Sequence, residues 1–270
     1  MSDSVRTQLK ASANGQSMRK RQSPKRRKSK KQEQAQKQAP QVENVSYETS
    51  NIEEHANVLF KPNPGPQTEF LAASEREVLY GGSAGGGKSY AMLADPLRYM
   101  GHPQFSGLLL RHTTEELREL IFKSQELYPK IWPGIKWSER KMQWTAPSGA
   151  RLWMSYLDRD EDVLRYQGLA FSWIGFDELT QWATPYAWNY MRSRLRSTAP
   201  DLPIFMRATT NPGGRGHHWV KKMFIDPAPY NRQFDATDLE TNEVLRYPAG
   251  HAKAGKPLFK RRFIPARLTD

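Results

Sequence analysis

Residues 81–89 read Gly-Gly-Ser-Ala-Gly-Gly-Gly-Lys-Ser, a glycine-rich segment that ends in a Lys-Ser pair. It follows an apolar run at 78–80 and precedes a segment with helical spacing at 90–100. Strand, glycine-rich loop and helix in that order satisfy G-x-x-x-x-G-K-[ST] over residues 82–89, which predicts a P-loop. Glycines let the backbone N–H groups surround a phosphate, and a helix N-terminus adds partial positive charge at the same point.

The P-loop predicts a binding site for ATP and Mg²⁺. Lys88 would reach the β- and γ-phosphates, and the Ser89 hydroxyl would hold Mg²⁺. The residues expected to bind the nucleotide are Gly82, Ser83, Ala84, Gly85, Gly86, Gly87, Lys88 and Ser89. A flexible glycine-rich turn is the alternative, but it explains neither the Lys-Ser pair nor the flanking strand and helix.

A second landmark is the apolar run at 171–176, which two adjacent carboxylates follow, Asp177 and Glu178. A buried strand would deliver both to its exposed carboxyl end. In P-loop ATPases the first carboxylate positions Mg²⁺ and the second orients and polarises the attacking water as general base. Acid pairs are common on surfaces, but this pair lies about ninety residues beyond a good P-loop. We therefore expect Asp177 at the metal and Glu178 as the base.

Polar residues also follow two further predicted strands. Arg111 ends the strand at 107–111, where it would face the ligand crevice of an open α/β sheet; a plain surface charge is the alternative. Thr209, Thr210 and Asn211 end the strand at 204–209 and can sense a γ-phosphate.

Gln67, some twenty residues before the P-loop, can present its amide to an adenine edge, although a surface glutamine is the commoner case.

The remaining pattern completes an α/β protein. Thr113 or Thr114 can cap a helix that has acidic residues in its first turn. Alternation at 141–145 and 150–157 around a Pro-Ser-Gly turn predicts a β-hairpin. The fold class expected is a P-loop NTPase of the ASCE type, with a mainly parallel central sheet flanked by helices and a disordered basic N-terminal tail.

The net charge of +13 is concentrated at the N-terminus. Residues 1–40 contain 12 Lys and Arg against Asp3 and Glu33, which leaves the rest of the chain nearly balanced. Few large apolar residues occur before residue 57, so we expect residues 1–57 to be a disordered tail that contacts nucleic-acid phosphates or an acidic protein. The motor domain is expected at 58–240 and an extension or linker at 241–270.

The chain has no cysteine, which excludes disulfide scaffolds, thiolate metal sites and cysteine nucleophiles. No apolar run approaches the length of a membrane span, and the N-terminus lacks the apolar core of a signal peptide. These features predict a soluble, unsecreted protein with no membrane partner.

Taken in order, the motifs resemble the large terminase subunit, the DNA-packaging motor of tailed bacteriophages. The resemblance covers about residues 59–265. It rests on Pro-Gly-Pro-Gln at 64–67, the P-loop (Walker A), Leu-Leu-Arg at 109–111 with Thr-Thr-Glu-Glu-Leu at 113–117, Tyr-Gln-Gly at 166–168, Phe-Asp-Glu at 176–178 (Walker B), Thr-Thr-Asn-Pro at 209–212 and Gly-His-His-Trp-Val at 216–220.

The resemblance implies a role for each matched residue. Gln67 resembles the adenine contact, Arg111 the adaptor arginine that responds to nucleotide, and Asp177 with Glu178 the Walker B aspartate and catalytic glutamate. Residues 209–211 resemble the motif that couples hydrolysis to DNA movement. Such motors form rings in which a neighbour can supply an arginine finger. The candidates for that finger are Arg140, Arg151 and Arg165.

The resemblance also implies partners and a location. It implies ATP hydrolysis that moves double-stranded DNA into a procapsid, with the portal protein and the small terminase subunit as partners. The location implied is the host cytoplasm, with transient binding at the portal vertex. Large terminases also carry a carboxy-terminal nuclease domain, and from residues 1–270 we expect ATP hydrolysis and no DNA cleavage.

Three other interpretations share part of this pattern. A ring-forming P-loop helicase or translocase outside packaging would have the same P-loop and acid pair. A small-molecule kinase would not need a Glu directly after the metal-binding Asp. A protein that binds ATP only as a structural ligand would not need both Lys88 and Glu178.

Overall fold

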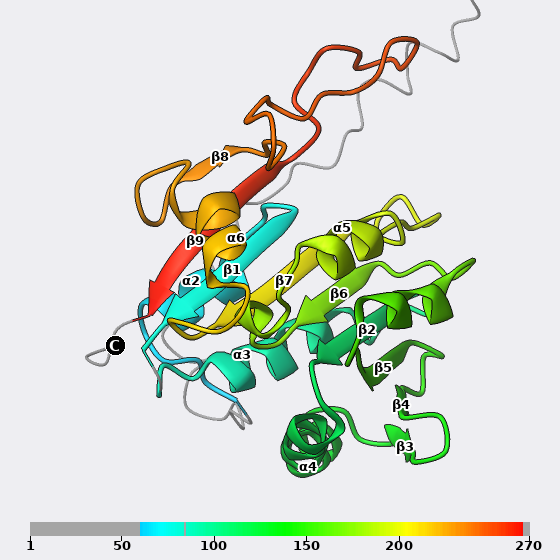
Figure 1. Ribbon diagram of the computed structural model, residues 1–270. Helices are drawn as coiled ribbons and strands as arrows, with labels where there is room; N and C mark the ends of the chain where they lie inside the picture. Colours follow the sequence, from blue (N-terminus) through cyan, green and yellow to red (C-terminus); the bar gives the residue numbers. More distant parts are fainter. Residues whose placement is uncertain (1–59, 84, 267–270) are drawn as a thin grey trace, which may run out of the picture. The chain divides into compact units, whose positions relative to one another are not determined.

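The computed structural model describes residues 60–83 and 85–266 (Figure 1). The tail expected at 1–57 lies outside these residues, as does Ala84 of the P-loop. In chain order the elements are α2 (Pro66–Ala72), β1 (Glu77–Gly82), α3 (Lys88–Ala94), η2 (Asp95–Tyr99), β2 (Ser106–Arg111), α4 (Thr114–Ile131), β3 (Lys136–Ser138), β4 (Gln143–Thr145), β5 (Arg151–Tyr156), η3 (Asp160–Tyr166), β6 (Trp173–Phe176), η4 (Leu179–Gln181), α5 (Tyr186–Arg192), β7 (Phe205–Thr210), α6 (His217–Val220), η5 (Lys221–Ile225), β8 (Gln233–Asp235) and β9 (Lys260–Ala266).

The described strands form one nine-stranded sheet in the order β3-β4-β5-β2-β6-β7-β1-β9-β8. The six strands from β5 to β9 in this order are mutually parallel, whereas β3, β4 and β8 pair antiparallel at the two edges. This confirms the mainly parallel α/β sheet predicted from the sequence. Because the parallel strands share one direction, the carboxyl ends of β1, β2, β6 and β7 meet at one edge of the sheet.

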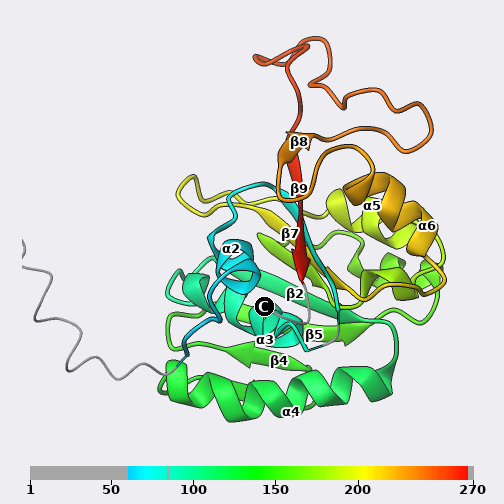
Figure 2. The same ribbon diagram turned by 90° about the vertical axis from the view of Figure 1, so that its left-hand side faces the viewer.

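Helices cover both faces of the sheet. Figures 1 and 2 show α2, α3 and α4 on one face and α5 and α6 on the other. Alternate residues of β1 join different apolar clusters, since Tyr80 packs with Phe70 of α2 and Leu79 packs in the cluster that contains Trp188 of α5. Strands buried on both faces explain the continuous apolar runs in the sequence. No helix in the described part of the chain is long and apolar enough to cross a bilayer.

Two elements near the P-loop differ from the sequence-based expectation. The helix expected at 90–100 is α3, which ends at Ala94 and continues as the 3₁₀ helix η2. Pro96 lacks the N–H for an α-helical bond, and its ring clashes with the carbonyl four residues earlier. Before β1, the proline-containing segment that carries Gln67 forms the helix α2, with Pro66 in its first turn, where a missing N–H has no consequence.

Two local predictions are confirmed. Thr113 caps α4 in a capping box, because its hydroxyl accepts from the N–H of Glu116 and the Glu116 carboxylate accepts from the N–H of Thr113. The predicted hairpin is formed by β4 and β5, which pair antiparallel. The other edge of β5 pairs parallel with β2 and so joins the hairpin to the main sheet.

The C-terminal strand lies inside the sheet. Residues 241–270 were expected to be an extension beyond the motor domain, but β9 pairs in parallel with β1, the strand that leads into the P-loop. Phe263 and Ile264 of β9 are buried, and Arg261 forms a buried ion pair with Glu77 of β1 at 2.8 Å. Residues 260–266 therefore belong to the same structural unit as the P-loop.

Candidate active site

The P-loop connects β1 to α3 and packs tightly against its surroundings. The Ser83 N–H donates to the carbonyl of Ala266 at 3.1 Å. Gly82 has a φ of 134°, and a Cβ there would collide with the same carbonyl. Gly87 has a φ of 66°, and its Cβ would lie 2.6 Å from the Gln67 amide nitrogen. Only glycine meets both the dihedral angles and the close approaches.

A hollow of about 340 Å³ opens at this loop. The residues around it come from the P-loop, α4 and the ends of β6 and β7: Gly85, Gly87, Lys88, Ser89, Tyr90, Lys123, Glu178 and Asn211. A Cβ added at Gly85 would meet no heavy atom within 4 Å, so its backbone borders open space. The fold thus brings three predicted groups to one cavity: the lysine that would bind phosphate, the serine hydroxyl that would hold the metal, and the glutamate that would act as base.

Lys88 bends back onto its own loop. Its ammonium group donates to the carbonyls of Ser83 at 2.6 Å and Gly82 at 3.5 Å. Burial lowers the pKa of Lys88, while the charges of Glu178 and Asp177 act in the opposite direction. The cation is thus held inside the phosphate cradle by carbonyl oxygens that a phosphate oxygen can replace.

Asp177 follows β6 directly and is fully buried. Its Oδ1 accepts from the Thr209 hydroxyl, and its Oδ2 lies 3.1 Å from Nε of Arg111. Burial raises the pKa of Asp177, and the Arg111 charge partly offsets this. The structure therefore brings together the predicted metal carboxylate and the arginine that ends β2.

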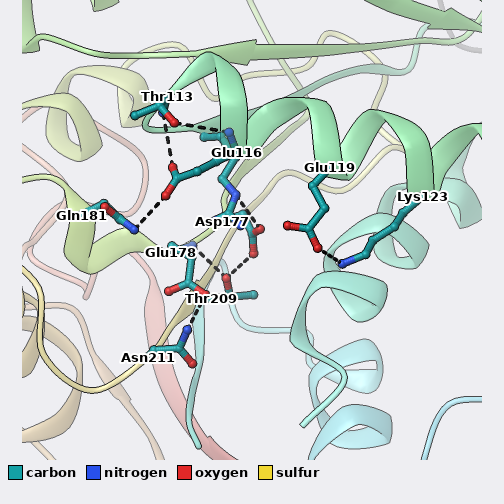
Figure 3. Close-up of polar contacts among 10 residues, drawn as sticks. Thr113, Glu116, Glu119, Lys123, Asp177, Glu178, Gln181, Thr209 and Asn211 are labelled. Atoms are coloured by element: carbon teal, nitrogen blue, oxygen red, sulfur yellow. Dashed lines mark hydrogen bonds and ion pairs between the residues drawn. The ribbon is translucent and has the colours of Figure 1, made fainter. Parts of the chain in front are cut away.

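Glu178 has a left-handed backbone with φ 63° and ψ 55°. This conformation is uncommon for residues other than glycine and concentrates at functional sites. Two contacts hold it: its N–H donates to the Thr209 hydroxyl at 3.0 Å, and its Oε1 accepts from the Asn211 amide at 2.6 Å (Figure 3). Burial, reinforced by the charge of Asp177, raises the pKa of Glu178.

The end of β7 connects these two carboxylates. Figure 3 shows Thr209 bonded to both Asp177 and Glu178, with Asn211 on the far side of Glu178. Thr210 contacts neither, because its hydroxyl bonds to the hydroxyl of Thr180 and the carbonyl of Asn211. Of the three residues expected to sense phosphate, Thr209 and Asn211 therefore touch the acid pair.

Gln67 lies in the first turn of α2 and is 4% exposed. Its amide nitrogen donates to the carbonyl of Gly87 at 2.9 Å, and its oxygen accepts from the N–H of Asn63 at 2.6 Å. One donor and one lone pair of the amide remain for another partner. The side chain therefore braces the P-loop and keeps the capacity to pair with an adenine edge.

Two polar groups near the site, Gln181 and Lys123, belong to none of the sequence motifs. Gln181, just beyond the acid pair, donates to the carboxylate of Glu116 at 3.1 Å and so ties the Walker B loop to the start of α4. Lys123 of α4 borders the hollow and pairs with Glu119 at 2.5 Å. The one sequence signal for Lys123 was the i, i+4 spacing from Glu119, a pattern that most exposed helices share.

The three candidate arginine fingers lie in different parts of the fold. Arg151 begins β5 opposite Ser106 of β2, which is the amino edge of the sheet, away from the hollow. Arg140 is exposed in the connection between β3 and β4. Arg165 lies in η3, after the carboxyl end of β5, and donates to the carbonyl of Tyr156 at 2.9 Å.

Solved structures of phage packaging proteins resemble the fold at low identity. The ATPase domain of the large terminase from Thermus phage P74-26 is 12% identical, with 77% of this chain and 81% of that chain covered and a TM-score of 0.49. The large terminase of another thermophilic bacteriophage is 15% identical, with 60% and 43% covered and a TM-score of 0.48. The N-terminal domain of the DNA packaging ATPase of bacteriophage phi29 is 16% identical, with 57% and 79% covered and a TM-score of 0.42.

These identities are too low to carry residue roles, and no curated protein gives a significant match to the sequence. The family assignment depends instead on a family model. The model of the phage terminase large subunit matches residues 74–246, more than half of the chain. The chain therefore belongs to the phage terminase large subunit family, the ATPases of phage DNA packaging.

Proposed function

We propose that the hollow binds ATP with Mg²⁺ and that its hydrolysis drives double-stranded DNA into a procapsid. The observation that supports this most is the meeting of Lys88, Ser89, Glu178 and Asn211 around one cavity. Asp177 directly precedes Glu178 and accepts a hydrogen bond from Thr209. These residues come from three separate parts of the chain, at 88–89, 177–178 and 211. In a P-loop ATPase they would bind phosphate, hold the metal and activate water.

The residues present fit a divalent cation. Oδ2 of Asp177 is buried, and among the described residues no hydrogen bond reaches it; its ion-pair partner is Arg111. A buried carboxylate oxygen and a serine hydroxyl are hard oxygen ligands of the kind Mg²⁺ prefers. Ser89 and Asp177 would hold the ion, directly or through water. When bound, Mg²⁺ neutralises charge that develops on the phosphate oxygens.

Glu178 is the general base in this proposal. Asn211 holds its Oε1, which leaves Oε2 to accept a proton from the attacking water. Its raised pKa brings the carboxylate closer to the operating pH, where a general base works best. Lys88, released from the carbonyls of Gly82 and Ser83, would bind the phosphates and stabilise their charge.

Coupling to DNA movement would start at Thr209. Its hydroxyl contacts the metal-binding residue and the base together, so a shift of either acts on the end of β7. Gly213 and Gly214 follow shortly after with φ of 92° and 87°, a conformation that favours glycine. Arg111, paired with Asp177, would respond to nucleotide through the same contact.

We propose that the chain acts in a homo-oligomeric ring on the portal protein, in the host cytoplasm and at the procapsid. Of the three candidate fingers, Arg165 is favoured, because it follows the carboxyl end of β5 and belongs to the same edge of the sheet as the hollow. The small terminase subunit is a further proposed partner. Membership in the terminase large subunit family supports these proposed partners.

The test measures ATP hydrolysis with and without duplex DNA, and DNA uptake by procapsids that carry the portal. A packaging motor shows hydrolysis stimulated by duplex DNA and encapsidated DNA that resists nuclease. A ring-forming helicase would instead separate strands of a forked duplex. Strand separation without uptake would replace the packaging assignment by the helicase alternative.

A further inference from the structure

A second lysine borders the hollow, and neither the sequence motifs nor the family assignment gives it a role. Lys123 lies in the middle of α4, and its side chain is 29% exposed. Lys88 and Lys123 are the two cations among the described residues that border the hollow. They reach it from different elements, one from the P-loop and one from α4.

The present partner of Lys123 is a weak one. Its ammonium pairs with Glu119, one turn earlier on the same helix, at 2.5 Å, and the Glu119 side chain is 62% exposed. An exposed i, i+4 pair of this kind contributes little to stability, because water screens it and both side chains must be ordered. Lys123 can therefore exchange Glu119 for a phosphate group with little loss of stability.

The surroundings of Lys123 keep it at the cavity. Its ammonium lies 5.9 Å from the ring centre of Tyr90, which follows Ser89 in the P-loop helix and also borders the hollow. This is within the range of a cation–π contact. Figure 3 shows Glu119 and Lys123 on α4 beside Asp177, on the opposite side of it from Asn211.

With a nucleoside triphosphate bound, the negative charges at the hollow would outnumber the positive ones, which favours a further cation there. A nucleoside triphosphate brings several negative charges beside the carboxylates of Asp177 and Glu178. Arg111 already faces Asp177, which leaves Lys88 as the cation that the P-loop motif supplies. Charge-assisted hydrogen bonds to phosphate are about twice as strong as neutral ones, so a second lysine at the phosphates would add substantially to affinity.

We propose that Lys123 leaves Glu119 when nucleotide binds and contacts the terminal phosphate of a nucleoside triphosphate. The inference rests on the proposed nucleotide site and adds a phosphate-binding residue to it. Since Lys123 belongs to α4, whose first turn Gln181 ties to the Walker B loop, the exchange would also report phosphate occupancy to that helix. Glu119 acts as the resting partner that keeps the ammonium in place.

The experiment compares the affinities of the full chain for ATP and ADP in Mg²⁺, with fluorescent analogues of both. Lys123→Met keeps the length of the side chain and removes its charge. We expect it to weaken ATP binding about tenfold while ADP binding changes much less, because the lost contact is to the terminal phosphate. Lys123→Arg should restore most of the ATP affinity, and Lys130→Met, on the last turn of the same helix, should change neither.

Lys88→Ala separates this inference from the proposed function. If Lys88→Ala abolishes nucleotide binding and Lys123→Met leaves the ratio of ATP to ADP affinity unchanged, the role of Lys123 is refuted and the site stands. If Lys88→Ala binds both nucleotides as the wild type does, the proposed site fails and the inference fails with it. Circular dichroism of each variant establishes that the fold is intact.

Discussion

The amide of Asn211 donates to Oε1 of Glu178 at 2.6 Å, although the two residues end different strands. Glu178 follows β6, and Asn211 follows β7, the next strand in the sheet. The bond fixes one carboxylate oxygen of the proposed base in an uncommon left-handed backbone geometry. Asn211 is therefore a positioning residue for the base, and its contribution should appear in turnover.

Asn211→Ala should lower kcat about 10- to 100-fold, because a hydrogen bond to a charged group contributes about 1.5–3 kcal/mol. ATP affinity should stay near that of the wild type, since Asn211 acts through Glu178. Steady-state hydrolysis gives kcat, and titration with a fluorescent ATP analogue gives the affinity. Asn189→Ala, at an exposed position of α5, is the control. An unchanged kcat in Asn211→Ala would remove its positioning role.

Thr209→Val keeps the shape of the side chain and removes the hydroxyl that bridges Asp177 and Glu178. The buried carboxylate of Asp177 and the part-buried N–H of Glu178 lose a partner, so we expect the free energy of unfolding to fall by about 1–3 kcal/mol together with a loss of kcat. Thr210→Val is the matched control, because the Thr210 hydroxyl bonds to Thr180 and Asn211 and, within the described part of the chain, to neither Asp177 nor Glu178. It should lose stability with a much smaller change in kcat. Equal losses of kcat in the two variants would contradict the bridge.

Glu77 ties three elements together, since it pairs with Arg192 of α5 and Arg261 of β9. Burial alone would raise the pKa of Glu77, but the two arginines outweigh it and hold that pKa below its ordinary value of 4.5. A carboxyl whose pKa is depressed on folding stabilises the protein fully above the pKa of the unfolded chain. That stability is lost as the pH falls through the folded-state pKa.

Glu77→Gln should therefore lower the free energy of unfolding at neutral pH by about 3–5 kcal/mol, because it leaves two arginines without their buried counterion. The variant should also lose part of the acid sensitivity of the wild type below about pH 4.5. Urea unfolding between pH 3 and 7 measures both effects. Glu126→Gln, exposed on α4, is the control and should change neither quantity. If Glu77→Gln keeps the full acid sensitivity of the wild type, Glu77 is not its source.

Gln67→Ala tests the adenine contact. If the remaining donor and lone pair of the amide read an adenine edge, the variant should lose selectivity for ATP over GTP as well as affinity. A loss of the brace to Gly87 alone would weaken the binding of both nucleotides equally. Competition between ATP and GTP for the wild type and the variant measures the ratio. We expect the ratio to fall, and an unchanged ratio with weaker binding would restrict Gln67 to bracing the loop.

The sequence was most informative where chemistry demands particular residues in one short segment. The P-loop with its preceding strand and the capping box of α4 could be located from local pattern alone. So could the position of Asp177 at the end of a buried strand. Each is defined within about ten residues, so the backbone geometry follows from the residue types themselves.

Long-range pairing could not be read in the same way. The sequence gives no local signal that β9 inserts beside β1, since their pairing depends on apolar residues that any buried strand carries. The left-handed backbone of Glu178 could not be predicted from the sequence either, because contacts from Thr209 and Asn211 hold this conformation in a residue that does not favour it. The same holds for Lys123, whose place at the hollow depends on how α4 packs on the sheet.

The most direct test of the proposed site is phosphate release from ATP by the wild type and by Glu178→Gln, across a range of protein concentration. The variant removes the charge of the base and keeps its shape. We expect wild-type turnover per chain to rise with concentration, as it must if a neighbour completes the site, and the variant to bind ATP without hydrolysing it. Turnover of Glu178→Gln equal to that of the wild type at every concentration would contradict the assignment of Glu178 as the base.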